Sequence, residues 1–194
     1  MTTTRNTLLA LTTALGLAFC SFGAHASGSM AGTLNAQMVL QSGCIITGAA
    51  GAGSTGVNYG SLDFGAHPST FTGVLTSTAS GGAGGAGATQ ITCSADITSL
   101  NVSVGAGNNA GQGGSIGTGA RAMKLGASSY LPYDVYSDSG MTSAYPTSGN
   151  AVSITLPGTG TAFSLPIYGR INKTSSAAMA SGTYADVLQV TLSW

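Results

Sequence analysis

The stretch Leu34–Gln41, LNAQMVLQ, has the pattern of a β-strand without an evident partner of its own. Apolar and polar side chains alternate along it, and a strand places alternate residues on opposite faces. One face would therefore carry the apolar side chains of Leu34, Ala36, Met38 and Leu40. A strand this close to the start of the chain needs a sheet to pack on, so the question is which sheet accepts it.

The residues before this stretch are typical of an export signal. Arg5 supplies a positive charge, the apolar run TLLALTTALGLAFC follows, and Ala24 and Ala26 are small residues at the positions that signal peptidase reads. We therefore expect a signal peptide over residues 1–26, cleaved near Ala26. No later apolar run is long enough to cross a bilayer, so we expect an exported protein without membrane insertion.

The sequence is unusually poor in charge. Charged residues make up 5% of it, against about 25% in an ordinary globular protein. The 168 residues that follow residue 26 carry four cations and five aspartates, so their net charge is about −1. We find no basic patch that would hold nucleic acid or an anionic membrane. A weakly charged surface favours association, which suits a protein that is made to be assembled.

Two cysteines remain in the mature chain, Cys44 and Cys93. In an oxidising compartment such a pair forms a disulfide by default. This disulfide would close a loop of 48 residues and stabilise the fold by roughly 4 kcal/mol. The alternative is a pair of free thiols or metal ligands, but with only His67 as a possible histidine ligand a metal site lacks ligands. We therefore predict the disulfide and no metal.

The rest of the sequence is typical of β-strands joined by turns. Short segments rich in β-branched and aromatic residues mostly alternate between apolar and polar positions. Clusters of small residues such as GAGNNAGQGGSIGTG separate them, and no window shows a helical period. The pattern predicts an all-β antiparallel sandwich in one domain. The segments expected as strands are 57–65, 70–78, 89–95, 100–105, 121–126, 131–138, 151–156, 162–171 and 184–194.

The final alternating segment is the counterpart of Leu34–Gln41. One of its faces carries Leu188, Val190, Leu192 and Trp194, and the residues between them are polar. The segment has high β-propensity and no charge, so an uncovered edge here would promote aggregation. The sequence thus predicts a strand that needs a sheet near its start and a strand that needs a neighbour near its end.

Six segments in sequence order resemble the spore coat protein U domain, which is found in Csu-type archaic chaperone-usher pilins. They are GTLNAQMVLQSGC, YGSLDFG, QITCSA, LPYDVYSDSGMTSAY, LPIYGRI and SGTYADVLQVTLSW, and they span Gly32 to Trp194. The resemblance implies an incomplete immunoglobulin-like antiparallel β-sandwich that lacks its final strand. A periplasmic chaperone first lends a strand to the groove. The N-terminal extension of a neighbouring pilin subunit then replaces that strand at an outer-membrane usher.

The resemblance also assigns roles to residues of this chain. In the N-terminal extension, residues 27–42, the donor-strand positions fall on Leu34, Ala36, Met38 and Leu40. In the domain, residues 43–194, the strand beside the acceptor groove falls on Leu188, Val190, Leu192 and Trp194. The paired cysteines of the family fall on Cys44 and Cys93. The expected protein is a structural subunit of a surface pilus that supports attachment or biofilm formation.

Two motifs bear on enzymatic function. The stretch Gly82–Gly87 fits G-x-G-x-x-G, but the strand-like ATQITC follows it where a dinucleotide site needs a helix, so we interpret it as a loop and expect no cofactor. Asp63, His67 and Ser69 are the residue types of a hydrolytic triad, yet they lie within one short loop-forming segment. The chain has no glutamate and the mature part has one histidine, so we predict no catalysis.

Two alternatives to the pilin hypothesis remain open. The first is a secreted protective coat protein that closes its groove with its own N-terminal strand. The second, disfavoured alternative is a secreted β-sandwich hydrolase. Linear multimers of the purified protein would separate the pilin from the coat protein, and His67→Ala would leave any surface phenotype intact unless the chain is a hydrolase.

Overall fold

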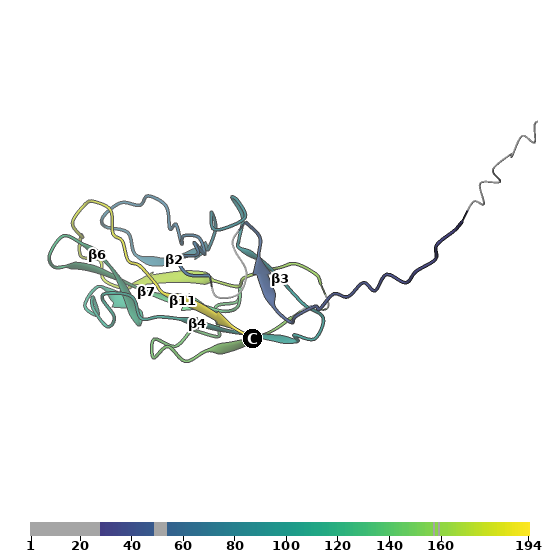
Figure 1. The fold of residues 1–194 in the computed structure, drawn as a ribbon. Coiled ribbons are helices and arrows are strands. Elements are labelled where there is room, and N and C mark those ends of the chain that lie inside the picture. Colours follow the sequence, from purple (N-terminus) through teal and green to yellow (C-terminus); the bar gives the residue numbers. More distant parts are fainter. Residues whose placement is uncertain (1–27, 49–53, 157, 159) are drawn as a thin grey trace, which may run out of the picture. The chain divides into compact units, whose positions relative to one another are not determined.

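The computed structural model describes residues 28–48, 54–156, 158 and 160–194 (Figure 1). The predicted signal peptide lies outside the described residues. The chain divides into two units, Met1–Val39 and Leu40–Trp194. In the first unit, residues 28–39 are exposed and form neither helix nor strand. The second unit carries the β-strands.

The second unit is built from short strands, and the described part of the chain has no helix. No helix there is accordingly long and apolar enough to cross a membrane. Most strands alternate between buried and exposed positions, as expected for sheets with one buried face. In chain order the strands are β1 (Cys44–Ile46), β2 (Gly73–Thr78), β3 (Gln90–Cys93), β4 (Ser99–Val104), β5 (Gly117–Thr118), β6 (Arg121–Leu125), β7 (Ser129–Tyr136), β8 (Val152–Thr155), β9 (Phe163–Ser164), β10 (Tyr168–Lys173) and β11 (Val190–Ser193).

The strands form three sheets. The first has the order β1-β3-β9, and the largest has the order β2-β10-β7-β6 with β5 paired to β10. The third has the order β11-β4-β8, and Figure 1 shows β11 beside β4. All pairings between these strands are antiparallel. The predicted all-β antiparallel fold class is therefore confirmed.

The hydrophobic core joins the largest sheet to the two smaller ones. β4 and β7 contribute most to it, because every second residue of each strand turns inward. These inward residues are Leu100, Val102, Val104, Leu131, Tyr133 and Val135. Ile91 of β3 and Ile171 of β10 are buried in the same cluster. Side chains from facing sheets that share one core are the packing of a β-sandwich, consistent with an immunoglobulin-like fold.

The segment expected as one strand at 162–171 forms two strands in different sheets. Before Pro166, the Leu165 N–H donates to Thr89 O at 2.8 Å and continues the pairing of β9 with β3. After it, Ile167 O accepts from Ala79 N–H at 2.9 Å and begins the pairing of β10 with β2. Proline has no N–H to give to either ladder, so it suits the point where the chain changes sheets.

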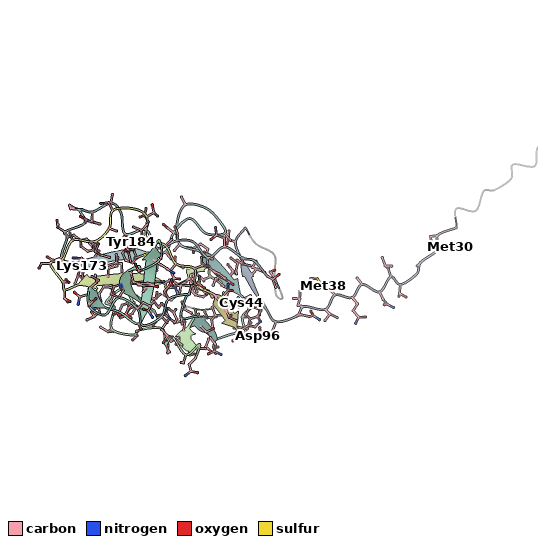
Figure 2. The ribbon with its side chains drawn as sticks, turned by 90° about the vertical axis from the view of Figure 1, so that its left-hand side faces the viewer. Met30, Met38, Cys44, Asp96, Lys173 and Tyr184 are labelled. Atoms are coloured by element: carbon pink, nitrogen blue, oxygen red, sulfur yellow. A yellow bond between two sulfur atoms is a disulfide. The ribbon has the colours of Figure 1, made fainter. Side chains whose placement is uncertain are left out.

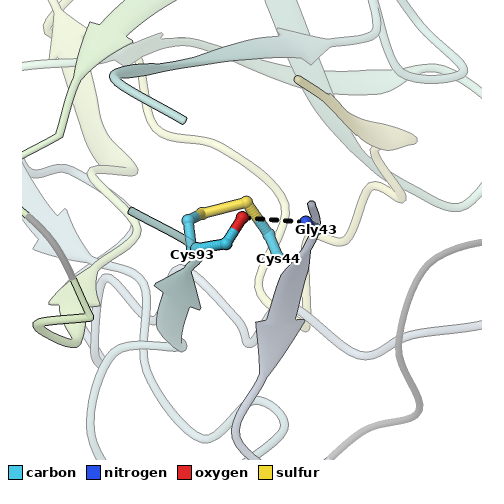
Figure 3. Close-up of a disulfide and its surroundings, with 4 residues drawn as sticks. Gly43, Cys44 and Cys93 are labelled. Carbon is cyan, nitrogen blue, oxygen red and sulfur yellow. Dashed lines mark hydrogen bonds between the residues drawn. A yellow bond between two sulfur atoms is a disulfide. The ribbon is translucent and has the colours of Figure 1, made fainter. Parts of the chain in front are cut away.

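The predicted disulfide between Cys44 and Cys93 is present in the structure (Figure 3). It joins the first residue of β1 to the last residue of β3, and the two residues are direct partners in the β1–β3 ladder. Both side chains are buried. The disulfide therefore holds the strand that follows the N-terminal extension against the centre of its sheet.

Candidate functional site

The domain contains an open groove with a volume of about 860 Å³. One wall is the segment 54–62 and the other is the segment 184–192. The floor between them is mainly apolar and consists of Ala79, Val104, Met123, Tyr133 and Ile167. Met123 and Tyr133 belong to the largest sheet, and Val104 belongs to β4 of the third sheet. The groove thus opens directly onto the hydrophobic core.

The wall at 184–192 contains three of the four residues predicted to border an acceptor groove. Leu188, Val190 and Leu192 are half-buried, pack against the core and line the groove. The residues between them are exposed. Trp194 is different, because it is 44% exposed and lies outside the groove lining. The strand β11 has thus turned its apolar face to the groove, but only as far as Leu192.

Within the described residues, the strand β11 of this wall is paired along one edge only, with β4. The Gly105 N–H donates to Gln189 O at 2.8 Å, and antiparallel pairing alternates between residues that bond to the partner strand and residues that point away. Thr191 is therefore the next residue bonded to β4, and Val190 and Leu192 present their N–H and C=O groups to the opposite edge. Among the described residues, no strand pairs with that edge of β11.

A carboxylate fixes the start of this wall. Asp186 lines the groove, and its two oxygens accept hydrogen bonds from the Asn108 N–H at 3.0 Å and from the Tyr133 hydroxyl at 2.9 Å. Burial raises the pKa of Tyr133, and the hydrogen bond to Asp186 raises it further. One residue earlier, Ala185 exchanges two backbone hydrogen bonds with Lys124 of β6. The wall is thus held to two sheets.

A buried arginine supports the same wall from behind. The Arg121 side chain is 0% exposed, and it donates hydrogen bonds to Gly105 O and Val104 O, each at 2.8 Å, and to Tyr145 O at 3.1 Å. Burial lowers the pKa of this guanidinium. Because Gly105 also binds Gln189, the arginine fixes the residue that holds the groove wall in register.

The opposite wall is held by the continuation of β2. Ser61 and Ser80 exchange two backbone hydrogen bonds, at 2.8 and 3.1 Å, and the Ala83 N–H donates to Asn58 O at 2.7 Å. Gly60 has a φ of 101°, and a Cβ there would lie 2.6 Å from Ser80 O. Only glycine fits that position without a shift. The sequence predicted a longer strand here, but the structure has one isolated bridge.

The predicted donor residues lie in an exposed segment without assigned strand structure. Leu34 is 95% exposed, Met38 is 79% exposed and Leu40 is 81% exposed (Met38 is labelled in Figure 2). Ala36 is exposed as well. All four predicted donor side chains are thus exposed, and the donor role stays a prediction.

The enzymatic motifs lie in loops. Gly82–Gly87 forms turns and bends just before β3. Asp63 accepts a hydrogen bond from the Gly65 N–H at 2.8 Å, and His67 Nε2 lies 2.7 Å from Phe64 O, so each has a local backbone partner. A second cavity of about 400 Å³ adjoins His67. No cluster of three or more potential metal ligands occurs within the described ranges.

Sequence reasoning missed the support of the groove. It gave Asp186, Tyr133 and Arg121 no role at the groove, and it did not identify the wall at 54–62. Asp186 offered one signal, since a lone carboxylate just before the uncharged run 187–194 is unusual in so weakly charged a chain. Arg121 offered none, because its partners are backbone carbonyls that no sequence pattern reveals.

Comparison with known proteins places the chain in a family. No curated protein sequence matches it. Among solved structures, it is similar to the pre-assembly complex of the chaperone CsuC with the tip adhesion subunit CsuE, from archaic chaperone-usher Csu pili of Acinetobacter baumannii. The identity is 20% and the TM-score 0.41, over 80% of this chain and 40% of that one, so the assignment does not rest on this likeness.

The sequence profile of the Spore Coat Protein U domain matches residues 30–191. The match covers most of the chain. It includes the predicted donor residues Leu34–Leu40, both cysteines and nearly all of the groove wall at 184–192. It confirms the resemblance that the six sequence segments indicated. The chain therefore belongs to the Spore Coat Protein U domain family.

Proposed function

We propose that this protein is a structural subunit of a surface pilus that is assembled by donor-strand exchange. In this proposal Leu34, Ala36, Met38 and Leu40 of one copy fill the groove of the next. A periplasmic chaperone occupies the groove before assembly, and an outer-membrane usher directs the exchange. The groove is the observation that carries the proposal, because it is open to the core and bordered by an unpaired strand edge.

The donor segment and the groove correspond in length and in chemistry. An extended strand rises about 3.3 Å per residue, so Leu34 and Leu40 lie roughly 20 Å apart, close to the length of the wall from Ala185 to Leu192. The apolar donor face would meet the apolar floor. The outward N–H and C=O groups of β11 would pair with the donor backbone, as in strand addition to a sheet edge.

The energy of such a joint is large enough to hold a filament without a covalent bond. Burial of Leu34, Met38 and Leu40 contributes roughly 1.5 to 3 kcal/mol each. Each backbone hydrogen bond to β11 adds about 1 kcal/mol net. The gross gain exceeds roughly 10 kcal/mol before the cost of ordering the donor strand.

The decisive experiment is a denaturing gel of the surface fraction, run with and without boiling. The pilin hypothesis predicts a ladder of multimers that collapses to one band on heating. Met38→Asp should abolish the ladder, because it places a carboxylate in an apolar groove. Gln37→Asp is the matched control, since it adds the same charge to the opposite face of the strand and should leave the ladder intact.

Two outcomes would contradict the proposal. If Met38→Asp forms the same ladder as the unaltered chain, Leu34–Gln41 is not the donor strand. If the unaltered protein gives one band under both conditions, the strand closes the groove of its own chain and the coat-protein alternative gains support. Attachment or biofilm formation should be lost together with the ladder in Met38→Asp and retained in Gln37→Asp.

A further inference from the structure

The disulfide lies where the N-terminal extension joins the domain. Only Gln41–Gly43 separate Leu40 from Cys44. β1, which begins at Cys44, has three residues and is an edge strand, paired among the described residues only with β3. Any pull on the extension therefore reaches this short strand at its first residue.

The chain in front of Cys44 is attached to the corner that follows β3. The Gly43 N–H donates to Ser94 Oγ at 3.0 Å, and the Ser94 N–H donates to Gly43 O at 2.9 Å. The Ser42 hydroxyl donates to the Asp96 carboxylate. Figure 2 shows Cys44 and Asp96 at the same end of the domain, and Figure 3 shows the Gly43 hydrogen bond beside the disulfide.

From Cys93 the chain leads directly to the groove wall. β3 ends at Cys93, and β4 begins at Ser99 after the turn in which the Ile97 N–H donates to Ser94 O at 3.1 Å. β4 then pairs with β11 along its length, from Val190 opposite Val104 to Ser193 opposite Asn101. The shortest covalent connection from the extension to β4, which pairs with the groove wall, thus passes through the disulfide.

The hydrogen bonds of the β1–β3 ladder would resist a pull along this connection only weakly. The ladder is antiparallel, and Cys44 and Cys93 face each other at one end of it. A force that enters at Cys44 and leaves through Cys93 separates the strands from that end, so the hydrogen bonds break one after another. A force passed along β4 and β11 instead runs parallel to the strands and loads their hydrogen bonds together.

We propose that the Cys44–Cys93 disulfide transmits the tension of the filament through each subunit. It carries tension from the subunit's own donor strand to β4 and thence to the donor strand of the neighbour. It thereby excludes the residues between the two cysteines from the loaded path. This inference rests on the proposed donor-strand function, because only a subunit that donates and accepts a strand is pulled at both places.

Loss of the disulfide would release a length of chain that can be measured. The two cysteines are 49 positions apart in the sequence, and their Cα atoms are 4.0 Å apart in the fold. A fully extended chain spans about 3.3 to 3.6 Å per residue, so loss of the disulfide would let each subunit lengthen by roughly 160 to 175 Å. With the disulfide intact, a subunit should show no step of that length before the donor strand slips out.

The first test stretches single filaments of the unaltered chain and of Cys44→Ala/Cys93→Ala in optical tweezers. The double variant should show steps of roughly 160 to 175 Å at forces that leave unaltered filaments at constant length. Leu131→Ala is the matched control, because it truncates a buried side chain of β7, outside the loaded path. It should show no such steps, and equal traces for all three filaments would overturn the inference.

A second measurement needs only the unaltered chain, in case the double variant does not assemble. Both cysteines are nearly buried, with exposed fractions of 5% and 6%, so a thiol reductant should reach the disulfide slowly in a relaxed filament. If the bond carries the load, filaments held under tension in a thiol buffer should lengthen in steps of roughly 160 to 175 Å. The rate of these steps should rise with force.

The outcomes separate the two proposals. A heat-sensitive ladder without thiol-dependent steps overturns the role of the disulfide in transmitting tension and leaves donor-strand exchange standing. Absence of the ladder from the unaltered chain overturns donor-strand exchange, and the role of the disulfide falls with it. Steps that occur without thiol in unaltered filaments would place the load elsewhere in the domain and overturn the inference as well.

Discussion

The Gly105 N–H donates to Gln189 O at 2.8 Å, and this bond decides which residues of the last strand face the groove. Because hydrogen-bonded positions alternate along an antiparallel ladder, it directs the backbone of Thr191 toward β4 and that of Val190 toward the open edge. The side chains follow the same alternation, with Val190 half-buried and Thr191 exposed. The two neighbouring residues should therefore differ sharply in their tolerance of charge.

We predict that Val190→Asp abolishes the heat-sensitive ladder and lowers the free energy of unfolding by about 2 to 4 kcal/mol, because a carboxylate there faces the apolar floor. Thr191→Asp should change that free energy by no more than about 0.5 kcal/mol, as surface substitutions usually do. Urea denaturation and the gel assay measure both effects. Similar behaviour of the two variants would mean that β11 does not present the face that the structure indicates.

A second prediction concerns the buried guanidinium of Arg121. Arg121→Met should lower the free energy of unfolding by about 2 to 4 kcal/mol, because it leaves the carbonyls of Val104, Gly105 and Tyr145 without partners in a buried site. Arg170→Met is the control, since Arg170 is only half-buried and stacks over the Tyr136 ring with 4.8 Å from Cζ to the ring centroid. It should cost about 1 kcal/mol or less.

The comparison of the two arginine variants is made by chemical denaturation of the purified chain. Equal losses would mean that Arg121 acts by filling space rather than by binding the three carbonyls. Arg121→Lys distinguishes these roles further, because an ammonium group cannot reproduce the planar arrangement of guanidinium donors. It should recover only a small part of the lost stability.

A third prediction concerns alkaline pH. Burial raises the pKa of Tyr133 and of Tyr145 above the usual 10.0. The folded protein therefore keeps both hydroxyl protons at pH values where the unfolded chain begins to lose them. This contribution is complete below about pH 10 and is lost as the pH rises from there toward the folded pKa values.

The free energy of unfolding should accordingly be flat from pH 8 to 9 and decrease above pH 10, as measured by urea denaturation at each pH. In Tyr133→Phe/Tyr145→Phe the decrease should be smaller. The double variant should also be less stable at pH 8, because it lacks the hydrogen bonds from these hydroxyls to Asp186 and to Pro166 O. An unchanged slope in the double variant would contradict the prediction.

The sequence predicted the parts of this fold that depend on local pattern. The alternation in β4, β7 and β11 indicated strands with one buried face, and the predicted export signal together with the cysteine count indicated the disulfide. It did not predict the change of sheet at Pro166. That change depends on Leu165 and Ile167 pairing with Thr89 and Ala79, which are distant in the chain.

The groove was predicted on one side only. Alternation placed Leu188, Val190 and Leu192 on one face, and the family resemblance placed that face beside a groove. Trp194 continues the same alternation, so the sequence did not indicate that the apolar lining ends before it. The wall at 54–62 has little regular strand structure, so its pattern could not specify its position. Arg121 illustrates the same limit, because its burial depends on three carbonyls from two other segments.

The glycines show most clearly that a sequence pattern does not reveal packing against distant residues. The segment 111–119, which contains β5, is rich in glycine. Its sequence does not distinguish the glycines that only provide flexibility from those that the packing requires. A Cβ on Gly119 would lie 2.4 Å from the backbone nitrogen of Tyr133, whereas a Cβ on Gly114 would have no atom within 4 Å.

Gly119→Ala should therefore lower the free energy of unfolding by about 2 to 4 kcal/mol, because the Tyr133 backbone belongs to the central strand β7 and cannot move aside. Gly114→Ala should be neutral or stabilising by up to about 1 kcal/mol, because it only restricts the unfolded chain. Urea denaturation of the two variants measures this difference directly, and equal stability of both would mean that the loop does not approach β7 as closely as the structure indicates.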